Sequence, residues 1–269
     1  MKRIKNIAAF SFIIAFVLML NSCAKLQQVS PTAVQSSQLF KDSIGLSEAL
    51  TGLYSTLEAP EYYGADYPML ADVNSDNGVA GGYNNTSLNE FGAYSVTSSN
   101  IYVQNTYVAI YKTIATANAI IAGENTVQGA SAGYLNSVKG QALTLRAMGH
   151  FDLLRAFGYH WDLTSPYGIP VVTTVQSSSS IVARSSVAAT YTSIIADLTQ
   201  AATLLNTATD RNPNYVNPAI VNALLARVYL YQKDYTDAAQ YASLVINDGA
   251  YTLTDASHYV ALYLSLIHI

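Results

Sequence analysis

The stretch Tyr134–Gly158 constrains the fold most, because its apolar positions leave little of a helix surface for solvent. In YLNSVKGQALTLRAMGHFDLLRAFG, apolar side chains recur at steps of three and four residues, in a stripe too broad for a lone surface helix. The polar side is thin and consists of Lys139, Arg146, His150 and Arg155. We expect Gly158 to end this helix in the left-handed conformation, which glycine adopts at low cost. A helix buried on most sides needs other helices around it, so the sequence predicts a mainly α-helical protein.

Three further apolar patterns of helical period follow polar residues that can cap a helix. The caps are Asp42 or Ser43 before a helix that ends near Pro60, Ser98–Asn100 before a helix that ends near Gly123, and Arg184–Ser186 before a helix through Leu205. These patterns predict that several long helices surround the central one.

Residues 217–249 predict a pair of helices joined by a turn at Lys233–Tyr235. Ala226, Tyr229, Ala238 and Ala242 match the spacing of a tetratricopeptide repeat. Small alanines let paired helices approach closely, and the tyrosine fills the groove between them. The repeat departs from the pattern at its end, where Gly249 and Ala250 replace the expected proline. Together with the earlier helices, this unit predicts a tetratricopeptide-repeat-like helical scaffold.

Composition excludes some classes of function. The net charge is −4, and residues 1–22 carry three positive charges, so the remainder carries −7. An acidic chain without a basic stripe argues against binding to nucleic acid. The single cysteine, Cys23, excludes an intrachain disulfide and a cysteine-based metal site.

The first residues have the pattern of a secretory signal. Lys2, Arg3 and Lys5 precede an apolar run from Ile7 to Leu20, which is shorter than the roughly 20 residues that span a membrane. The residues before Cys23 resemble the cleavage box of a bacterial lipoprotein, which predicts a signal peptide over residues 1–22 and acyl chains such as palmitate on Cys23. An ordinary signal with a chance cysteine, or an uncleaved anchor, is the alternative. Residues 23–41 are polar and predict a flexible tether.

Residues 60–97 contain tyrosines among glycine, asparagine, aspartate and serine, without a helical period. Long irregular segments in a compact domain are usually functional or disordered, and aromatic residues argue against disorder. The segment therefore predicts a functional loop that carries Tyr62, Tyr63, Tyr67, Tyr83 and Tyr94. Within it, the oxygen-bearing residues of Asp72–Gly78 suggest a calcium loop, but two key positions of that motif are wrong, and an Asx-rich turn is the favoured interpretation.

A second irregular segment, Tyr159–Gln176, contains the only tryptophan, Trp161. Sugar rings pack their C–H faces on tyrosine and tryptophan, and polar side chains satisfy the sugar hydroxyls. For any one of these aromatic residues, packing beneath a loop is the commoner role, but as a group they predict a ligand site.

No motif in the sequence supports catalysis. The four histidines lack metal-binding spacing, and neither a nucleophile elbow nor a phosphate-binding loop is present. Asp72 and Asp76 are a weak candidate for a glycosidase pair, because two loop carboxylates at this spacing are common by chance. Arg146 and His150 lie one turn apart and can reach a common partner, but we interpret them as structural groups of a buried helix. We therefore expect no enzyme activity, no cofactor and no metal site.

Several motifs resemble those of SusD/RagB-type lipoproteins, which are nutrient-binding partners of TonB-dependent transporters in Bacteroidetes. The motifs, in order, are Gly140-Gln141-Ala142, Leu145-Arg146-Ala147, Phe151, Leu154, Phe157-Gly158 and Tyr167-Gly168-Ile169-Pro170. Gln141 stands where this family usually has a glutamate, which removes a local salt bridge from the pattern. The resemblance covers about residues 20–264.

The resemblance implies a SusD-like helical scaffold with long irregular ligand loops, an outer-membrane location facing the exterior, and a lipid anchor. The implied function is to capture an oligosaccharide and pass it to a SusC-like TonB-dependent transporter. Family members often carry an aspartate-rich segment near the ligand, which adds Asp76 and Asn77 to the candidate site residues. A peptide-capturing RagB-like binder and a structural adaptor protein are the alternatives.

Family members extend well beyond the length of this chain. We therefore interpret residues 42–264 as an incomplete N-terminal helical domain and residues 265–269 as a non-native or truncated tail.

Overall fold

The structure, a computed structural model, describes residues 39–75, 77–78, 85–177, 179–206, 214–249, 251–252 and 254–266. The chain separates into two compact units, Met1–Gln35 and Ser36–Ile269, and the described residues all belong to the second. The predicted signal peptide, Cys23 and most of the predicted tether lie outside the described residues.

The described residues form helices joined by turns and irregular segments. The α-helices are α3 (Ser43–Leu57), α4 (Asp66–Val73), α5 (Thr86–Gly92), α6 (Ile101–Gly123), α7 (Ala132–Phe157), α8 (Val187–Leu205), α9 (Pro218–Gln232), α10 (Tyr235–Asn247) and α11 (Ala256–Leu266). A π-helical turn, η1 (Pro60–Gly64), precedes α4, and a 3₁₀ turn, η2 (Glu124–Thr126), follows α6. Over the described ranges the only β-pairing is one isolated bridge between Asp42 and Gln128. This confirms the predicted mainly α-helical class.

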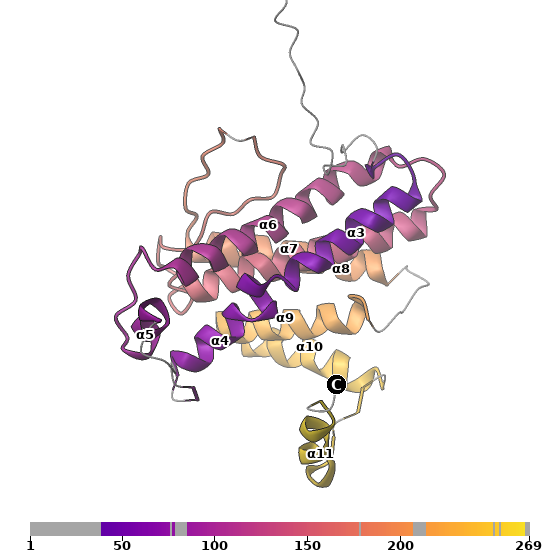
Figure 1. Ribbon diagram of the computed structural model, residues 1–269. Helices are drawn as coiled ribbons and strands as arrows, with labels where there is room; N and C mark the ends of the chain where they lie inside the picture. The colour runs from indigo at the N-terminus through magenta and orange to yellow at the C-terminus, as the bar shows by residue number, and fades with distance from the viewer. Residues whose placement is uncertain are drawn as a thin grey trace, which may run out of the picture. The chain divides into compact units, whose positions relative to one another are not determined.

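Helix α7 lies at the centre of these helices, between α6 and α8 (Figure 1). Leu143 and Phe151 on one side of α7 join a core cluster with residues of α8 and α9. Ala142 and Leu145 on the opposite side join a second cluster with α3 and α6. A third cluster includes Leu153 and lies against η1 and α6. The prediction that this helix is buried on most sides is confirmed.

Close approach of helices to α7 depends on small residues. A Cβ at Gly140 would lie 2.7 Å from Cγ of Leu205 on α8, which is closer than real Cβ contacts allow. A Cβ at Gly149 would lie 3.0 Å from Cγ1 of Ile114 on α6. Glycine at these positions therefore sets the distances between α7 and its two neighbours.

The predicted helix starts are confirmed by their caps. Asp42 accepts hydrogen bonds from the N–H groups of Ile44 and Gly45 at the start of α3. Asn100 caps α6 and Ser186 caps α8 in the same way. Each side-chain oxygen satisfies an N–H group that has no partner within the helix.

The predicted left-handed conformation of Gly158 is wrong. Helix α7 ends at Phe157, and Gly158 is extended, with φ −114° and ψ 169°. Glycine is needed there for space, because a Cβ would lie 2.8 Å from Cδ1 of Leu154. The N–H of Gly158 still bonds to the carbonyl oxygen of Leu154, so the last turn of the helix is closed.

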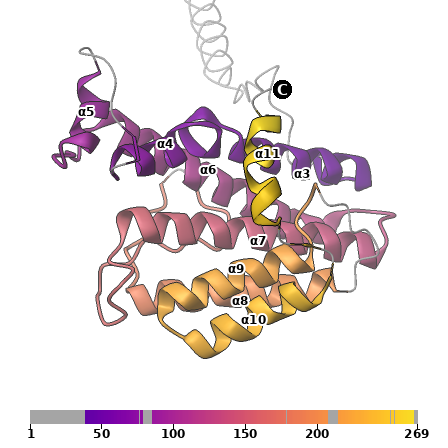
Figure 2. The same cartoon turned by 90° about the horizontal axis from the view of Figure 1, so that it is seen from below.

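Helices α9 and α10 form the predicted antiparallel pair, which lies next to α8 (Figure 2). Lys233 makes the turn between them in the left-handed conformation, with φ 68°. The rings of Tyr229 and Tyr241 stack with centroids 5.5 Å apart, and Ala238 on α10 is buried. These contacts confirm the repeat-like packing.

The predicted irregular loop over residues 60–97 contains more regular structure than expected. It holds η1, α4 and α5, which are short and separated by turns. Helix α4 has eight residues and α5 has seven, so neither is long enough to show a clear helical period in sequence.

Arg146 and His150 have separate partners on the buried surface of α7. The guanidinium of Arg146 donates two hydrogen bonds to the carboxylate of Asp197, at 2.8 and 2.6 Å, and one to Asn118. The Nε2 atom of His150 accepts a hydrogen bond from the N–H of Val172 at 3.1 Å. Both side chains therefore hold α7 to neighbouring segments, as expected for structural groups.

Acid is expected to destabilise this fold through His150. Burial, and then the charge of Arg146, lower the pKa of His150 from 6.5 to about 3. Between these values the unfolded chain takes up a proton that the folded chain does not, so the stabilisation is complete above pH 6.5 and is lost as the pH falls toward 3. The loss is at most about 1.4 kcal/mol per pH unit.

Urea unfolding at about pH 7 and about pH 5 measures this loss. The matched variant is His150→Gln, whose amide oxygen can accept the Val172 hydrogen bond and does not titrate. Its free energy of unfolding should fall less over the same pH interval. An identical fall in both proteins would contradict the assignment to His150.

Candidate functional site

A buried carboxylate organises the aromatic side chains that follow α3. Asp152 on α7 is 1% exposed, and its Oδ2 accepts hydrogen bonds from the hydroxyls of Tyr62, at 2.6 Å, and Tyr63, at 2.9 Å. Its Oδ1 accepts from Arg155, one turn further along α7. Burial and the nearby charge of Asp152 raise the pKa of both tyrosines, so their hydroxyls stay protonated and remain donors.

Arg155 links this cluster to helices α4 and α9. Its Nη2 donates to the hydroxyl of Tyr67 at 3.0 Å. The guanidinium carbon lies 5.0 Å from the ring centre of Phe151 and 5.8 Å from that of Tyr231 on α9. The cation is therefore held by a carboxylate and by aromatic faces, which fixes its position.

Above this cluster lies an open groove of about 880 Å³. Its walls come from η1 and α4, from α5 and the segment after it, from α6, from the end of α7 and the segment after it, and from α9. The polar or aromatic residues that line it include Tyr63, Tyr67, Thr97, Ser98, Thr106, Arg155, His160, Arg227 and Tyr231. A groove of this size with aromatic walls and a few polar groups is typical of a small-ligand site.

The predicted site residues lie at different distances from the groove. Tyr63, 40% exposed, and Tyr67 line it, whereas Tyr62 is fully buried beneath it. Tyr94 and Asn77 are exposed outside its lining. Asp76 and Tyr83 lie outside the described residues. The structure thus brings together the tyrosines of η1 and α4 and leaves contact with a ligand as a prediction.

Trp161 belongs to an exposed group of aromatic rings beside the groove. Its ring stacks on that of Tyr159, with centroids 5.2 Å apart and planes 17° apart, and more than half of each side chain is exposed. The ring of His160, which lines the groove, lies 5.2 Å from that of Trp161. A flat, exposed ring pair next to a groove is suited to stacking against a sugar.

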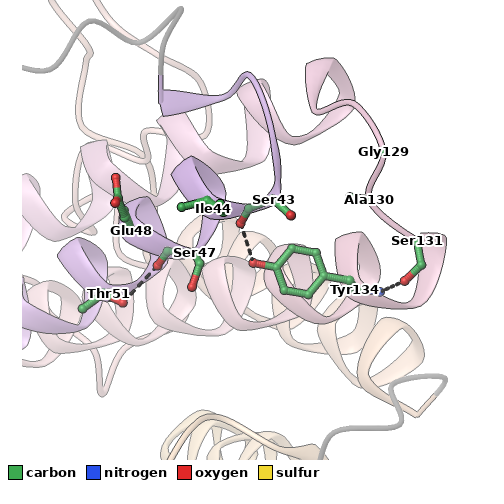
Figure 3. Close-up of a pocket in the computed structure, with 9 residues that line it drawn as sticks. All are labelled: Ser43, Ile44, Ser47, Glu48, Thr51, Gly129, Ala130, Ser131 and Tyr134. Carbon is green, nitrogen blue, oxygen red and sulfur yellow. Dashed lines mark hydrogen bonds between the residues drawn. The ribbon is translucent and has the colours of Figure 1, made fainter.

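A second hollow, of about 680 Å³, lies where α3 and α7 begin (Figure 3). Tyr134 crosses it and donates a hydrogen bond to the carbonyl oxygen of Ser43 at 3.2 Å. The remaining lining is mostly serine, threonine, glycine and alanine, with Glu48 as its charged residue. With a single aromatic ring and no cationic side chain in its lining, this hollow is the weaker candidate.

Sequence reasoning missed three groove residues, Arg155, Arg227 and Tyr231, and the buried Asp152 that holds Arg155. Arg155 was named as a polar residue of this apolar helix and Asp152 was not, although polar residues need partners when buried. No local pattern in the sequence connects Arg227 or Tyr231 to the tyrosines of residues 62–67, because only the packing of α9 beside α7 brings them together.

Comparison with known proteins identifies the family. The model of a SusD-like family, described as starch-binding and associating with the outer membrane, matches residues 26–230. The chain belongs to the SusD-like family. Its tetratricopeptide-repeat-like helical scaffold is the fold of that family.

Individual SusD-like proteins agree with this assignment. SusD-like protein P2 of Formosa agariphila is 27% identical over 244 residues, which cover 88% of this chain and 46% of that protein. A SusD superfamily protein of Bacteroides vulgatus superposes with a TM-score of 0.73 at 27% identity, over 82% of this chain and 51% of its own. Another, from Bacteroides thetaiotaomicron, superposes with a TM-score of 0.70 at 28% identity, over 80% and 48%. This chain therefore spans about half the length of the SusD-like relatives it matches.

Removing the hydroxyl of Tyr62 is expected to destabilise this SusD-like fold. In Tyr62→Phe the buried carboxylate of Asp152 loses a donor, and a hydrogen bond to a charged group contributes about 1.5–3 kcal/mol. Urea denaturation followed by circular dichroism should show a loss of that size.

The control for this measurement is Tyr94→Phe, at a tyrosine that is 69% exposed. Its free energy of unfolding should change by less than about 0.5 kcal/mol. Equal effects in the two variants would show that the Tyr62 hydroxyl does not support Asp152.

Proposed function

We propose that this chain is the glycan-binding part of a surface lipoprotein that captures oligosaccharides and passes them to a SusC-like TonB-dependent transporter. The observation that carries the proposal is the groove, which combines exposed tyrosine faces with hydrogen-bonding side chains. The description of the family as starch-binding and associated with the outer membrane supports it.

The groove offers both kinds of contact that a sugar requires. The faces of Tyr63 and Tyr67 can stack on pyranose rings, while Thr97, Ser98 and Arg155 supply groups for sugar hydroxyls. The ring pair of Tyr159 and Trp161 lies next to His160 and can extend the contact to further sugar units. In this mechanism the protein retains the ligand and closes like a lid over the transporter, without bond cleavage.

Membrane attachment is assigned to acyl chains on Cys23 after removal of residues 1–22. Each buried CH₂ group contributes about 0.8 kcal/mol, so more than one chain gives a stable anchor. In the part of the chain that the structure describes, no helix is both long and apolar enough to cross a membrane. Attachment through Cys23 would place residues 23–41 as the tether and the helical domain outside the outer membrane.

Three other functions are distinguishable from this one. A RagB-like binder would capture peptides in the same groove and would not bind glycans. A structural adaptor would bind a protein partner equally well after the groove aromatics are replaced by alanine. An enzyme would release new reducing ends from a polysaccharide, which we do not expect.

Replacing Tyr63 by alanine is expected to weaken glycan binding. Titration calorimetry of the chain against malto-, laminari- and uronate-containing oligosaccharides identifies the ligand that binds most tightly. For that ligand, Tyr63→Ala should raise the dissociation constant about tenfold or more, because truncating a central interface aromatic commonly costs more than about 1.4 kcal/mol.

The matched control is Tyr235→Ala, at an exposed tyrosine on α10 outside the groove lining. Its dissociation constant should equal that of the unchanged chain. Failure of every glycan to bind, together with capture of peptides, would replace the proposal by the RagB-like alternative.

A further inference from the structure

We infer that the groove selects acidic oligosaccharides, whose uronate carboxylates or sulfate esters bind Arg227 and Arg155. This inference rests on the proposed glycan-binding function and adds the chemical class of the ligand. It starts from a contrast in charge. The chain has 17 acidic and 13 basic residues, yet the groove lining includes two arginines and neither aspartate nor glutamate.

The two arginines differ in how much of their charge is already neutralised. Arg155 forms an ion pair with Asp152, so this pair contributes little net charge to the groove. Arg227 on α9 is exposed and has neither an ion pair nor a hydrogen bond with any residue that the structure describes. Arg227 therefore supplies the uncompensated positive charge.

Both guanidiniums act on the same part of the groove. Burial and the charge of Asp152 raise the pKa of Tyr63, whereas the charges of Arg155 and Arg227 act on it in the opposite direction. Tyr63, Arg155 and Arg227 all line the groove, so both cations border the space next to the Tyr63 ring. A sugar stacked on that ring would hold its acidic substituent within reach of a guanidinium.

Buried polar atoms around the groove also lack partners within the described residues. They are Oγ1 of Thr106, Nε of Arg155 and Nδ1 of His160, and all three residues line the groove. The fourth such atom, Nδ1 of His150, lies in the core of the bundle. A buried polar group without a partner costs about 1–3 kcal/mol. Three of the four residues that carry such atoms line this one groove, which favours a polar over an apolar ligand.

The carboxylate at the rim does not cancel this charge locally. Glu90 accepts hydrogen bonds from the N–H and hydroxyl of Thr97 and from the side chain of Asn100. Glu90 is thus held by these donors and is absent from the groove lining. Burial and the charge of Arg155 lower the pKa of His160, so this imidazole is neutral at pH 7 and adds no charge.

The guanidinium group is matched to the anions that acidic sugars carry. Its planar fork donates two parallel hydrogen bonds to a carboxylate or a sulfate, and charge-assisted bonds of this kind are about twice as strong as neutral ones. A neutral glycan would gain the aromatic contacts but would leave Arg227 without a counter-charge. The groove should therefore discriminate by the charge of the sugar as well as by its shape.

Matched pairs of ligands test this inference. Oligogalacturonates and their methyl esters differ in the uronate charge and in one methyl group per ester, and κ-carrageenan oligosaccharides and their desulfated counterparts differ only in sulfate. Calorimetry with the full chain at low ionic strength should show that at least one charged member binds about tenfold or more tightly than its neutral partner. The pair that shows the difference identifies the anion as carboxylate or sulfate.

Variants of the free arginine assign the effect. Arg227→Gln should remove most of the preference for the charged member, and Arg227→Lys should keep part of it because it retains the charge without the fork. Lys112→Gln makes the same change in net charge on the exposed surface of α6, outside the groove lining, and should leave the preference intact. Thermal melting verifies that each variant is folded.

The outcomes separate this inference from the function on which it rests. Equal binding of charged and neutral members in both pairs would overturn the acidic preference and leave glycan binding in place. A preference that survives Arg227→Gln would overturn the assignment to Arg227. Binding of none of these glycans, nor of malto- or laminari-oligosaccharides, would overturn the proposed function itself.

Discussion

The enclosure of α7 is the constraint on which the other features depend. A helix with neighbours on most of its circumference has to satisfy every polar side chain from within the protein, because a buried charge without a partner is strongly destabilising. Arg146 meets this requirement through Asp197, and Asp152 meets it through Arg155 and two tyrosines. The first pair ties α7 to α8, and the second fixes the tyrosines of η1 at the edge of the bundle. The site is thus a consequence of the same requirement that stabilises the fold.

The helices were predictable because their signals are local. The period of the apolar residues in Tyr134–Gly158 and the caps at Asp42, Asn100 and Ser186 all act within one or two helical turns. Helix α4 was not predicted because its eight residues make little more than two helical turns, too few to show a helical period. The conformation of Gly158 was mispredicted because glycine is favoured there by the lack of space for a Cβ atom, and not by a left-handed backbone.

The groove was only half predictable, because part of its lining comes together through packing between residues far apart in the sequence. The tyrosines of residues 62–67 drew attention because aromatic residues in an irregular stretch are uncommon. Arg227 and Tyr231 lie more than 150 residues away and reach the groove only through the packing of α9. Tyr62 shows that composition does not predict burial, because a fully buried tyrosine and an exposed one are the same residue in sequence. Burial divides the cluster into rings that support the groove and rings that line it.

The charges around the groove also bear on binding as opposed to hydrolysis. Glycoside hydrolysis commonly needs two carboxyl groups on either side of the scissile bond, one of them free to accept or donate a proton. Asp152 is the carboxylate nearest to the lining tyrosines, and it already accepts hydrogen bonds from Tyr62, Tyr63 and Arg155. These three contacts hold the carboxylate in a fixed position at the base of the cluster. Asp152 therefore orients Tyr63 and Arg155, two of the residues that line the groove, through the same contacts that fix it to the bundle.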